Sequence, residues 1–411
     1  MGAVGRDVRL AGLVALLVVA STACSGPPPA GHVTVQVDHP VALADVPLHV
    51  RVTGLDGGQR VTITANLHDA SDREMLGFAT FRADARGVVD LATAQPSGGG
   101  SYRQTEAMGV IWSMVAVDGN PPLFRPEPTQ GLTVSVRDSA GRTLADRVVK
   151  RTYLPAGVTT RYLFVSPDGF FGHYYAPAAS AARRPAVLLF GGAEGGLGAY
   201  LDVAAGLLAA HGFPALAIGY FGLQGLPSEL ASVPLEYFVR ALDWLRSQPG
   251  VDTAHVFAYG DSRGSEAALL LGALRPDLVR GVVALSPSSV VHCSFPDCSG
   301  PAWTLNGAPL PYTSQFDGPV PTDDPAAVIP VERIAGPVFL VCGQNDFIWP
   351  SCPFAQAMDQ RLGSHAHQLL TYPGAGHNVG WLVPDQPDSV FADAVGKADA
   401  WPRLLGLLNG L

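Results

Sequence analysis

The first third of the chain alternates apolar and polar residues with a period of two. Such alternation turns one face of an extended segment toward a core and is typical of half-buried β-strands. The clearest segments are HVTVQV, LHVRVTGL, RVTITANL and LTVSVRD. Turn-forming stretches such as LDGGQ (55–59) and DARG (84–87) separate strands. We therefore predict an all-β, immunoglobulin-like sandwich over residues 37–150.

From residue 151 onward, short apolar runs alternate with helical stretches such as PLEYFVRALDWLRSQP (234–249). Six runs have the length of buried strands: AVLLFGG (186–192), FPALAIGY (213–220), HVFAYG (255–260), GVVALSP (281–287), PVFLVCG (337–343) and HQLLTYPG (367–374). This alternation predicts an α/β domain with a mainly parallel, doubly wound sheet over residues 151–411. In such sheets, functional residues gather at the carboxyl ends of the strands.

The first 24 residues carry an export signal. Arg6 and Arg9 precede an apolar run over residues 10–20 that is too short for a comfortable membrane span, and small residues follow. The sequence STAC is similar to a bacterial lipobox, which makes Cys24 the lipidated first residue of the mature protein. A Ser/Gly/Pro-rich linker follows over residues 25–36. We expect a cell-envelope lipoprotein held to the membrane by acyl chains. Because Ser21 is unusual in a lipobox, cleavage and plain secretion is the alternative.

Export changes the expected state of the cysteines. Besides Cys24, the chain has Cys293, Cys298, Cys342 and Cys352, an even number that favours two disulfides in an oxidising compartment. Of the three possible pairings we favour Cys293–Cys298 and Cys342–Cys352, because short loops close most easily. Free buried thiols are the alternative. No Cys or His cluster has zinc spacing, so we predict no metal site.

Charge and motif composition exclude two other classes of function. The chain of 411 residues has a formal net charge of −9 and no basic run, so we expect no nucleic-acid partner. The glycine-rich stretch FGGAEGGLGAY (190–200) lacks both G-x-G-x-x-G and the P-loop lysine, which disfavours a phosphate-binding turn. We predict no cofactor.

A G-x-S-x-G motif lies between a predicted strand and an Ala/Leu-rich helix. Gly260 and Gly264 flank Ser262. A nucleophile elbow needs small residues at these positions because its strand and helix pass close together. The alternative is an ordinary helix start capped by Ser262 or Asp261.

Two further candidates follow later strands. Asp346 comes after PVFLVCG and His377 after HQLLTYPG, so the order along the chain is Ser, Asp, His, as in α/β-hydrolases. His377 would take the proton of Ser262 and pass it to the leaving group, while Asp346 would orient and stabilise the imidazole.

Other predictions concern the surroundings of the nucleophile. The oxyanion hole would use the N–H of Gly192 or Ala193 and the N–H of Arg263. Glu266 suits a helix N-terminus by its charge, with a direct site role as the alternative. The long segment between Pro287 and Ile329 is either a lid or acyl-pocket wall, or a surface insertion.

Several long blocks resemble the acyl-CoA thioesterase / bile acid-CoA:amino acid N-acyltransferase family over about residues 40–410. These blocks are GGSYRQTEAMGVIWSM, EGG, AIGYFGLQGLPSELASVPLEYF, GDSRGSE, IPVERIAGPVFLVCGQNDFIWPS and YPGAGHNVG. The resemblance implies an Ig-like domain followed by an α/β-hydrolase domain. It also places the family's catalytic triad on Ser262, Asp346 and His377.

Two departures from the better-known members shape the functional prediction. Amino-acid-conjugating members use Cys where this chain has Ser262, which favours hydrolysis. Those members work inside cells, whereas free acyl-CoA should be scarce outside. We therefore predict an exported serine hydrolase that cleaves acyl thioesters or esters through an acyl-serine. The alternatives are an acyltransferase with the same triad and a non-catalytic envelope binding protein on a hydrolase scaffold.

Overall fold

A computed structural model describes residues 32–69, 71–119, 128–178, 182–384 and 390–411. The predicted signal segment, Cys24 and most of the linker lie outside these residues. Among the helices of the described residues, none combines the length and the hydrophobicity of a membrane span.

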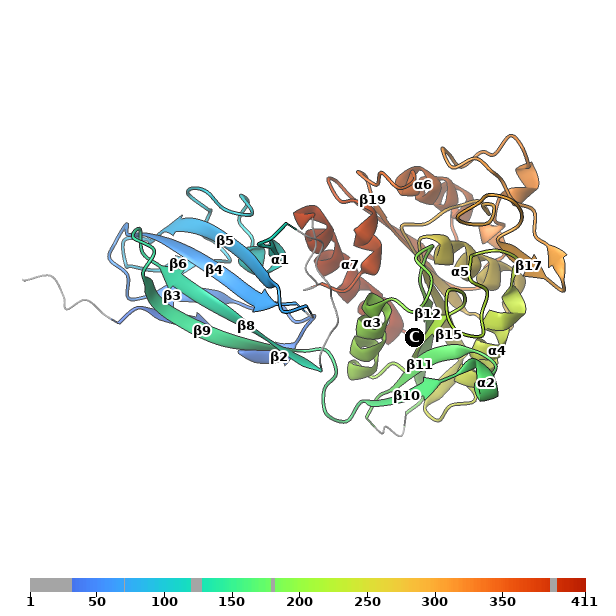
Figure 1. The fold of residues 1–411 in the computed structure, drawn as a ribbon, viewed down its shortest axis with the longest axis horizontal. Coiled ribbons are helices and arrows are strands. Elements are labelled where there is room, and N and C mark those ends of the chain that lie inside the picture. The colour runs from blue at the N-terminus through green and yellow to red at the C-terminus, as the bar shows by residue number, and fades with distance from the viewer. Residues whose placement is uncertain (1–31, 70, 120–127, 179–181, 385–389) are drawn as a thin grey trace, which may run out of the picture.

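The N-terminal part is built from two β-sheets, as the period-two pattern predicts (Figure 1). One has the strand order β1–β3–β6, with β1 at Thr34–Val37, β3 at Val50–Thr53 and β6 at Val89–Asp90. The other has the order β2–β9–β8–β4–β5–β7, with bounds Val41–Leu43, Thr143–Thr152, Thr129–Arg137, Arg60–His68, Glu74–Arg82 and Val115–Ala116. Alternate residues of β4, such as Val61 and Ile63, are buried in the core between the sheets.

The C-terminal part contains an eight-stranded sheet with the order β10–β11–β13–β12–β15–β16–β19–β20. The bounds in that order are Thr159–Leu163, Phe171–Ala176, Ala215–Gly219, Arg184–Phe190, Val251–Asp261, Gly281–Leu285, Val338–Gly343 and His367–Tyr372. Strand β11 runs in the opposite direction to the other strands of this sheet. Read in chain order, the strands are arranged 1-2-4-3-5-6-7-8, which is the α/β-hydrolase arrangement. The predicted α/β fold is confirmed.

Helices cover both faces of this sheet. On one face, α3 (Ala199–Ala210) and α7 (Phe391–Asn409) pack against apolar side chains such as Leu189 and Phe257. On the other face, α4 (Leu235–Arg246), α5 (Arg263–Leu274) and α6 (Ser351–Leu362) pack against Leu188 and Val256. Figure 1 shows α3 and α7 on the side of the sheet that faces the N-terminal sheets.

Helix α7 and α3 also contact the N-terminal part. Asp45 accepts hydrogen bonds from His211 Nε2 at 2.6 Å and from Trp401 Nε1 at 2.7 Å. Tyr102 stacks on Phe391 with ring centroids 5.5 Å apart. Helix α7 packs apolar side chains against both parts of the molecule: Phe391 and Ala394 against the N-terminal core, and Trp401 and Leu404 against the main sheet.

The long segment after Pro287 is not structureless. It contains β17 (Trp303–Leu305) and β18 (Ala308–Pro309), which join β14 (Val233–Pro234) in a three-stranded sheet. Trp303 is fully buried. The segment is thus a packed cap beside the carboxyl ends of the main strands.

Candidate active site

Ser262 sits in a strained turn between β15 and α5. Its backbone has φ 53° and ψ −123°, a region that non-glycine residues rarely adopt. A Cβ on Gly260 would lie 2.2 Å from the Gly264 carbonyl oxygen, and one on Gly264 would lie 2.3 Å from the Gly191 carbonyl oxygen. Both glycines of the motif are therefore required by close packing. The Ser262 side chain makes no capping hydrogen bond. This disagrees with the alternative in which Ser262 only caps the helix.

The structure brings Asp346 and His377 together. They follow β19 and β20, and His377 Nδ1 lies 2.7 Å from Asp346 Oδ2. The other oxygen, Asp346 Oδ1, accepts the Ile348 N–H at 3.0 Å. A Cβ on Gly343 would lie only 2.2 Å from the Gly376 carbonyl oxygen, so the two loops are in direct contact. The carboxylate is thus held in place to orient the imidazole.

The His377 loop packs on the nucleophile elbow. A Cβ on Gly380 would lie 2.1 Å from Asp261 Oδ1 and 2.8 Å from Ser286 Oγ. Ser286 Oγ donates to the His377 carbonyl oxygen at 2.6 Å. Ser262 and His377 both belong to the part of the chain that the structure describes, and no hydrogen bond joins their side chains. Catalytic hydrogen bonds of this kind commonly tighten only when substrate binds.

Burial lowers the pKa of His377, but neighbouring carboxylates more than compensate. The hydrogen bond that His377 donates to Asp346 and the charges of Asp261, Asp346 and Glu194 raise this pKa, and the net direction is upward from 6.5. The imidazolium formed during proton transfer is therefore stabilised.

The backbone N–H groups predicted to form the oxyanion hole differ in their hydrogen bonding. The Arg263 N–H belongs to the first residue of α5, where helical amides have no acceptor within the helix. The Gly192 N–H instead donates to Glu194 Oε1 at 3.1 Å. The Gly192 loop does lie against the nucleophile, since a Cβ on Gly192 would be 2.7 Å from Ser262 Cβ. Ala193 follows in the same loop.

Two family models match the chain. One describes the N-terminal region of acyl-CoA thioester hydrolases/BAAT and covers residues 45–163. The other describes the BAAT / acyl-CoA thioester hydrolase C-terminal region and covers residues 233–299 and 302–389. The chain belongs to this family. BAAT is the bile acid-CoA:amino acid N-acyltransferase.

Curated relatives of this thioester hydrolase/BAAT member span most of its length. The mitochondrial acyl-coenzyme A thioesterase 2 of Mus musculus is 31% identical over 397 residues, with 88% of this chain and 85% of that protein covered. Acyl-coenzyme A thioesterase 1 of Mus musculus is 30% identical over 355 residues, with 82% of each chain covered.

Solved structures that match part of this chain include Est1E from Butyrivibrio proteoclasticus and the dienelactone hydrolase from Anabaena variabilis. Est1E is 16% identical with a TM-score of 0.40, and covers 62% of this chain and 100% of its own. The dienelactone hydrolase is 19% identical with a TM-score of 0.39, and covers 60% and 98%.

Asp261, the residue before the nucleophile, is a buried acid that sequence reasoning considered only as a helix cap. Burial raises its pKa to about 7, and the charges of Glu194 and Asp346 add to the rise, while His377 and Tyr200 oppose it. Its Oδ1 atom is buried without a hydrogen-bond partner. Its only signal in the sequence is its position between an apolar strand and the nucleophile.

Glu266 occupies the other side of the elbow and is fully buried. It accepts hydrogen bonds from Arg263 Nε at 2.7 Å, His292 Nδ1 at 2.9 Å and Trp303 Nε1 at 2.8 Å. Burial raises its pKa, but the Arg263 charge and the His292 hydrogen bond make the net direction downward. Arg263 Nη2 also donates to the Cys293 carbonyl oxygen at 2.8 Å. Glu266 therefore anchors the cap segment to α5.

Both local disulfides favoured from the sequence are present. Cys293–Cys298 closes a turn in the cap, and Cys342–Cys352 encloses the loop that carries Asp346. In the described part of the chain, no group of three or more His, Cys, Asp or Glu side chains gathers as a metal site.

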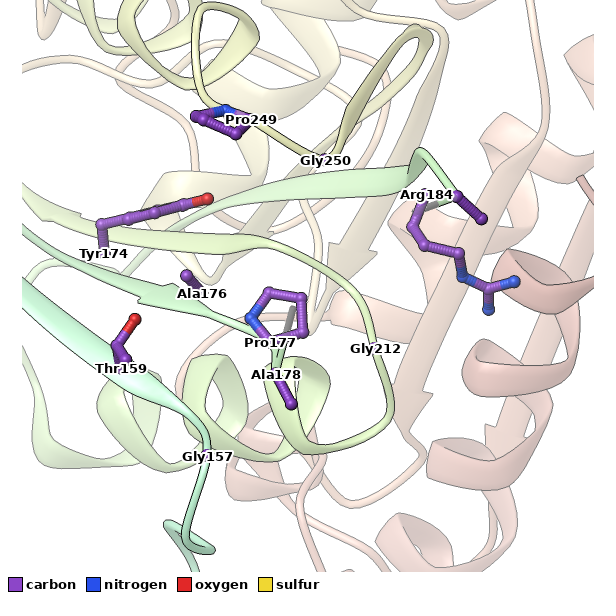
Figure 2. Close-up of a pocket in the computed structure, with 11 residues that line it drawn as sticks. Gly157, Thr159, Tyr174, Ala176, Pro177, Ala178, Arg184, Gly212, Pro249 and Gly250 are labelled. Atoms are coloured by element: carbon purple, nitrogen blue, oxygen red, sulfur yellow. The ribbon is translucent and has the colours of Figure 1, made fainter. Parts of the chain in front are cut away.

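A cavity of about 640 Å³ lies away from these residues (Figure 2). It is lined by residues at the amino ends of β12 and β15, including Arg184 and Gly250, whereas Ser262 follows the carboxyl end of β15. The cavity thus lies at the opposite end of the strands from the candidate catalytic residues.

Proposed function

We propose that this protein is an exported serine hydrolase that cleaves acyl thioesters or esters through an acyl-serine intermediate. The observation that carries the proposal is the strained Ser262 elbow, against which the loop of the Asp346–His377 pair is packed. The relatives named acyl-coenzyme A thioesterases support the acyl thioester as substrate class.

The proposed reaction has two steps. Ser262 Oγ attacks the acyl carbonyl carbon while His377 Nε2 takes its proton, and the bond from carbon to the leaving sulfur or oxygen breaks as His377 returns that proton. Water then attacks the acyl-serine, again with His377 as base, and the products are a carboxylic acid and free Ser262. The Arg263 N–H is placed to stabilise the tetrahedral oxyanion.

Side chains beside the catalytic acid support an apolar acyl group. Phe347 and Ile348, the two residues after Asp346, are 85% and 59% exposed. Exposed apolar side chains at the mouth of a site commonly mark a contact surface. An acyl chain lying against them would remove them from water.

Export and lipidation at Cys24 complete the proposal. The two disulfides fit an oxidising compartment. The natural acyl donor would then be an envelope ester or thioester rather than free acyl-CoA. Mass spectrometry of the mature N-terminus should find acylated Cys24 in the membrane fraction, whereas full-length protein in the cytosol would contradict this part.

Product analysis tests the catalytic part. The purified protein is incubated with a panel of acyl-CoA thioesters and acyl esters, with and without amine or alcohol acceptors. Free acid that depends on Ser262 supports hydrolysis, and an acylated acceptor in its place would establish an acyltransferase. If no substrate is turned over and no serine-directed probe reacts, the protein is a binding protein on a hydrolase scaffold.

A further inference from the structure

Glu194 places a carboxylate in the loop that was predicted to form the oxyanion hole. Its Oε1 atom accepts the Gly192 N–H at 3.1 Å and the Tyr200 hydroxyl at 2.7 Å. Its Oε2 atom and Ser262 Oγ border the same point, because a Cβ built on Gly192 would be 2.9 Å from Glu194 Oε2 and 3.1 Å from Ser262 Oγ. One carboxylate therefore binds the predicted donor, and both of its oxygens lie on the side of the loop that packs against Ser262.

No cation balances this carboxylate among the described residues, which show no ion pair for Glu194. The guanidinium of Arg263, the residue after the nucleophile, donates instead to Glu266 and to the cap carbonyls. Tyr220 faces the loop as a neutral hydroxyl that donates to the Gly191 carbonyl oxygen at 2.9 Å. The negative charge of Glu194 thus acts on the site without local compensation.

A carboxylate and a tetrahedral oxyanion cannot share the same N–H. The oxyanion is stabilised only by donors aimed at its own position, and a negative charge beside it opposes its formation. The Gly192 N–H must therefore leave Glu194 before it can serve catalysis. Glu194 is an exposed residue, so its carboxylate can rotate into water, which solvates it at little cost.

We propose that Glu194 is a positioning residue that occupies the oxyanion hole of the resting enzyme and releases the Gly192 N–H to the carbonyl oxygen of an arriving substrate. The inference rests on the proposed serine hydrolase function. While Glu194 holds the Gly192 N–H, Ser262 is less reactive than it would be beside an open oxyanion hole. The acyl group of a bound substrate displaces the carboxylate, and the Tyr200 hydroxyl, now 3.4 Å from Asp261 Oδ2, can turn to that oxygen.

The negative charge of Glu194 also contributes to the raised pKa of His377. The groups that face this imidazole are Asp346, Asp261 and Glu194, all acidic. From α7, Asp393 accepts the Gly376 N–H, and Lys397 lies over the Trp381 ring. Removing the charge of Glu194 should lower the pKa of His377 and move the acidic limb of the activity profile to lower pH.

The test compares Glu194→Gln, which keeps the shape and an acceptor oxygen, with Glu194→Ala. Glu229→Gln removes one negative charge from an exposed position outside the Gly192 loop and is the matched control. The second-order rate of inactivation by a fluorophosphonate is measured from pH 5.5 to 9. We expect about tenfold faster inactivation for Glu194→Ala, which frees the Gly192 N–H, and a smaller increase for Glu194→Gln, which loses the charge but keeps an acceptor oxygen. In both variants the acidic limb should shift down by roughly half a pH unit. Glu229→Gln should match the wild type.

Equal or slower inactivation of both Glu194 variants, with an unshifted limb, would overturn the inference and leave Glu194 as a scaffold of the loop. Failure of the proposed function gives a different result, because the wild type would then show no Ser262-dependent labelling at any pH. Glu194→Gln keeps the test valid if the alanine variant folds poorly.

Discussion

Acidic side chains on the two sides of the nucleophile elbow differ in how far their charge is compensated. On the α5 side, Glu266 is surrounded by donors from Arg263, His292 and Trp303. On the loop side, Asp261 has an oxygen without a partner and lies near Glu194, a second acid without an ion pair. A buried charge with partners destabilises the fold when one partner is removed, whereas uncompensated charge shifts the pKa values of its neighbours. We infer that the α5 side holds the cap and that the loop side tunes the chemistry.

The largest effect should come from Asp346, the acid that orients His377. Asp346→Asn should lower kcat by about 10⁴-fold with little change in unfolding, because the amide favours the wrong imidazole tautomer. The matched variant Asp261→Asn should retain far more activity, since Asp261 has no hydrogen bond to His377. Steady-state kinetics of the two variants, together with their melting curves, would check this. Equal losses in both variants would show that the two acids are not distinct in role.

On the α5 side, loss of Glu266 should cost stability. Glu266→Ala leaves Arg263 buried without its partner and should lower the free energy of unfolding by about 3–5 kcal/mol. Glu266→Gln keeps an acceptor oxygen and should lose less. Urea unfolding of the three proteins measures the difference. If Glu266→Ala unfolded at the wild-type urea concentration, the anchoring role would be wrong.

The raised pKa of Asp261 predicts that the stability of the folded protein depends on pH in an unusual direction. Its pKa is raised to about 7, so the folded protein keeps a proton that the unfolded chain releases above about pH 4. Stability should therefore fall as pH rises from about 4 to about 7, by at most about 1.4 kcal/mol per pH unit. Asp261→Asn should remove this contribution and be more stable than the wild type at pH 8. Unfolding curves at pH 5, 6, 7 and 8 test the sign; parallel curves for both proteins would refute it.

The smallest effect should come from the disulfide around Asp346. Replacing Cys342 and Cys352 by Ser should lower stability by roughly 2 kcal/mol, because the closed loop is short. It should also lower kcat several-fold by loosening the acid loop. The matched pair Cys293→Ser and Cys298→Ser should cost stability without that loss of kcat. Thermal melts and kinetics on both double variants separate the two bridges, and identical activity losses would remove the special role of the acid loop.

Much of the fold follows from the hydrophobic pattern, since all six predicted strands of the α/β domain are found. Two strands of the eight-stranded sheet were missed: β10 is its edge strand and β11 lies next to it, and they mix aromatic, histidine and threonine residues. The short strands of the three-stranded sheet, β14, β17 and β18, were missed as well. Both β10 and β11 are partly exposed, so they lack the apolar run that marks a buried strand. The Ig-like assignment of the N-terminal sheets stays a prediction.

The order of Ser262, Asp346 and His377 along strand ends could be read from the sequence because their chemistry is tied to strand ends. The role of Glu266 could not, since His292 and Trp303 reach it from the cap. The state of Gly192 also depends on a contact within the loop, the hydrogen bond to Glu194, that a glycine-rich pattern does not specify.

The central claim is that Ser262 is a working nucleophile. The most direct measurement is mass spectrometry of the purified protein after brief exposure to a fluorophosphonate, with Ser262→Ala as the control. The account predicts a single adduct on Ser262 in the wild type and none in the variant. An equal adduct on both proteins, or none on either, would contradict it.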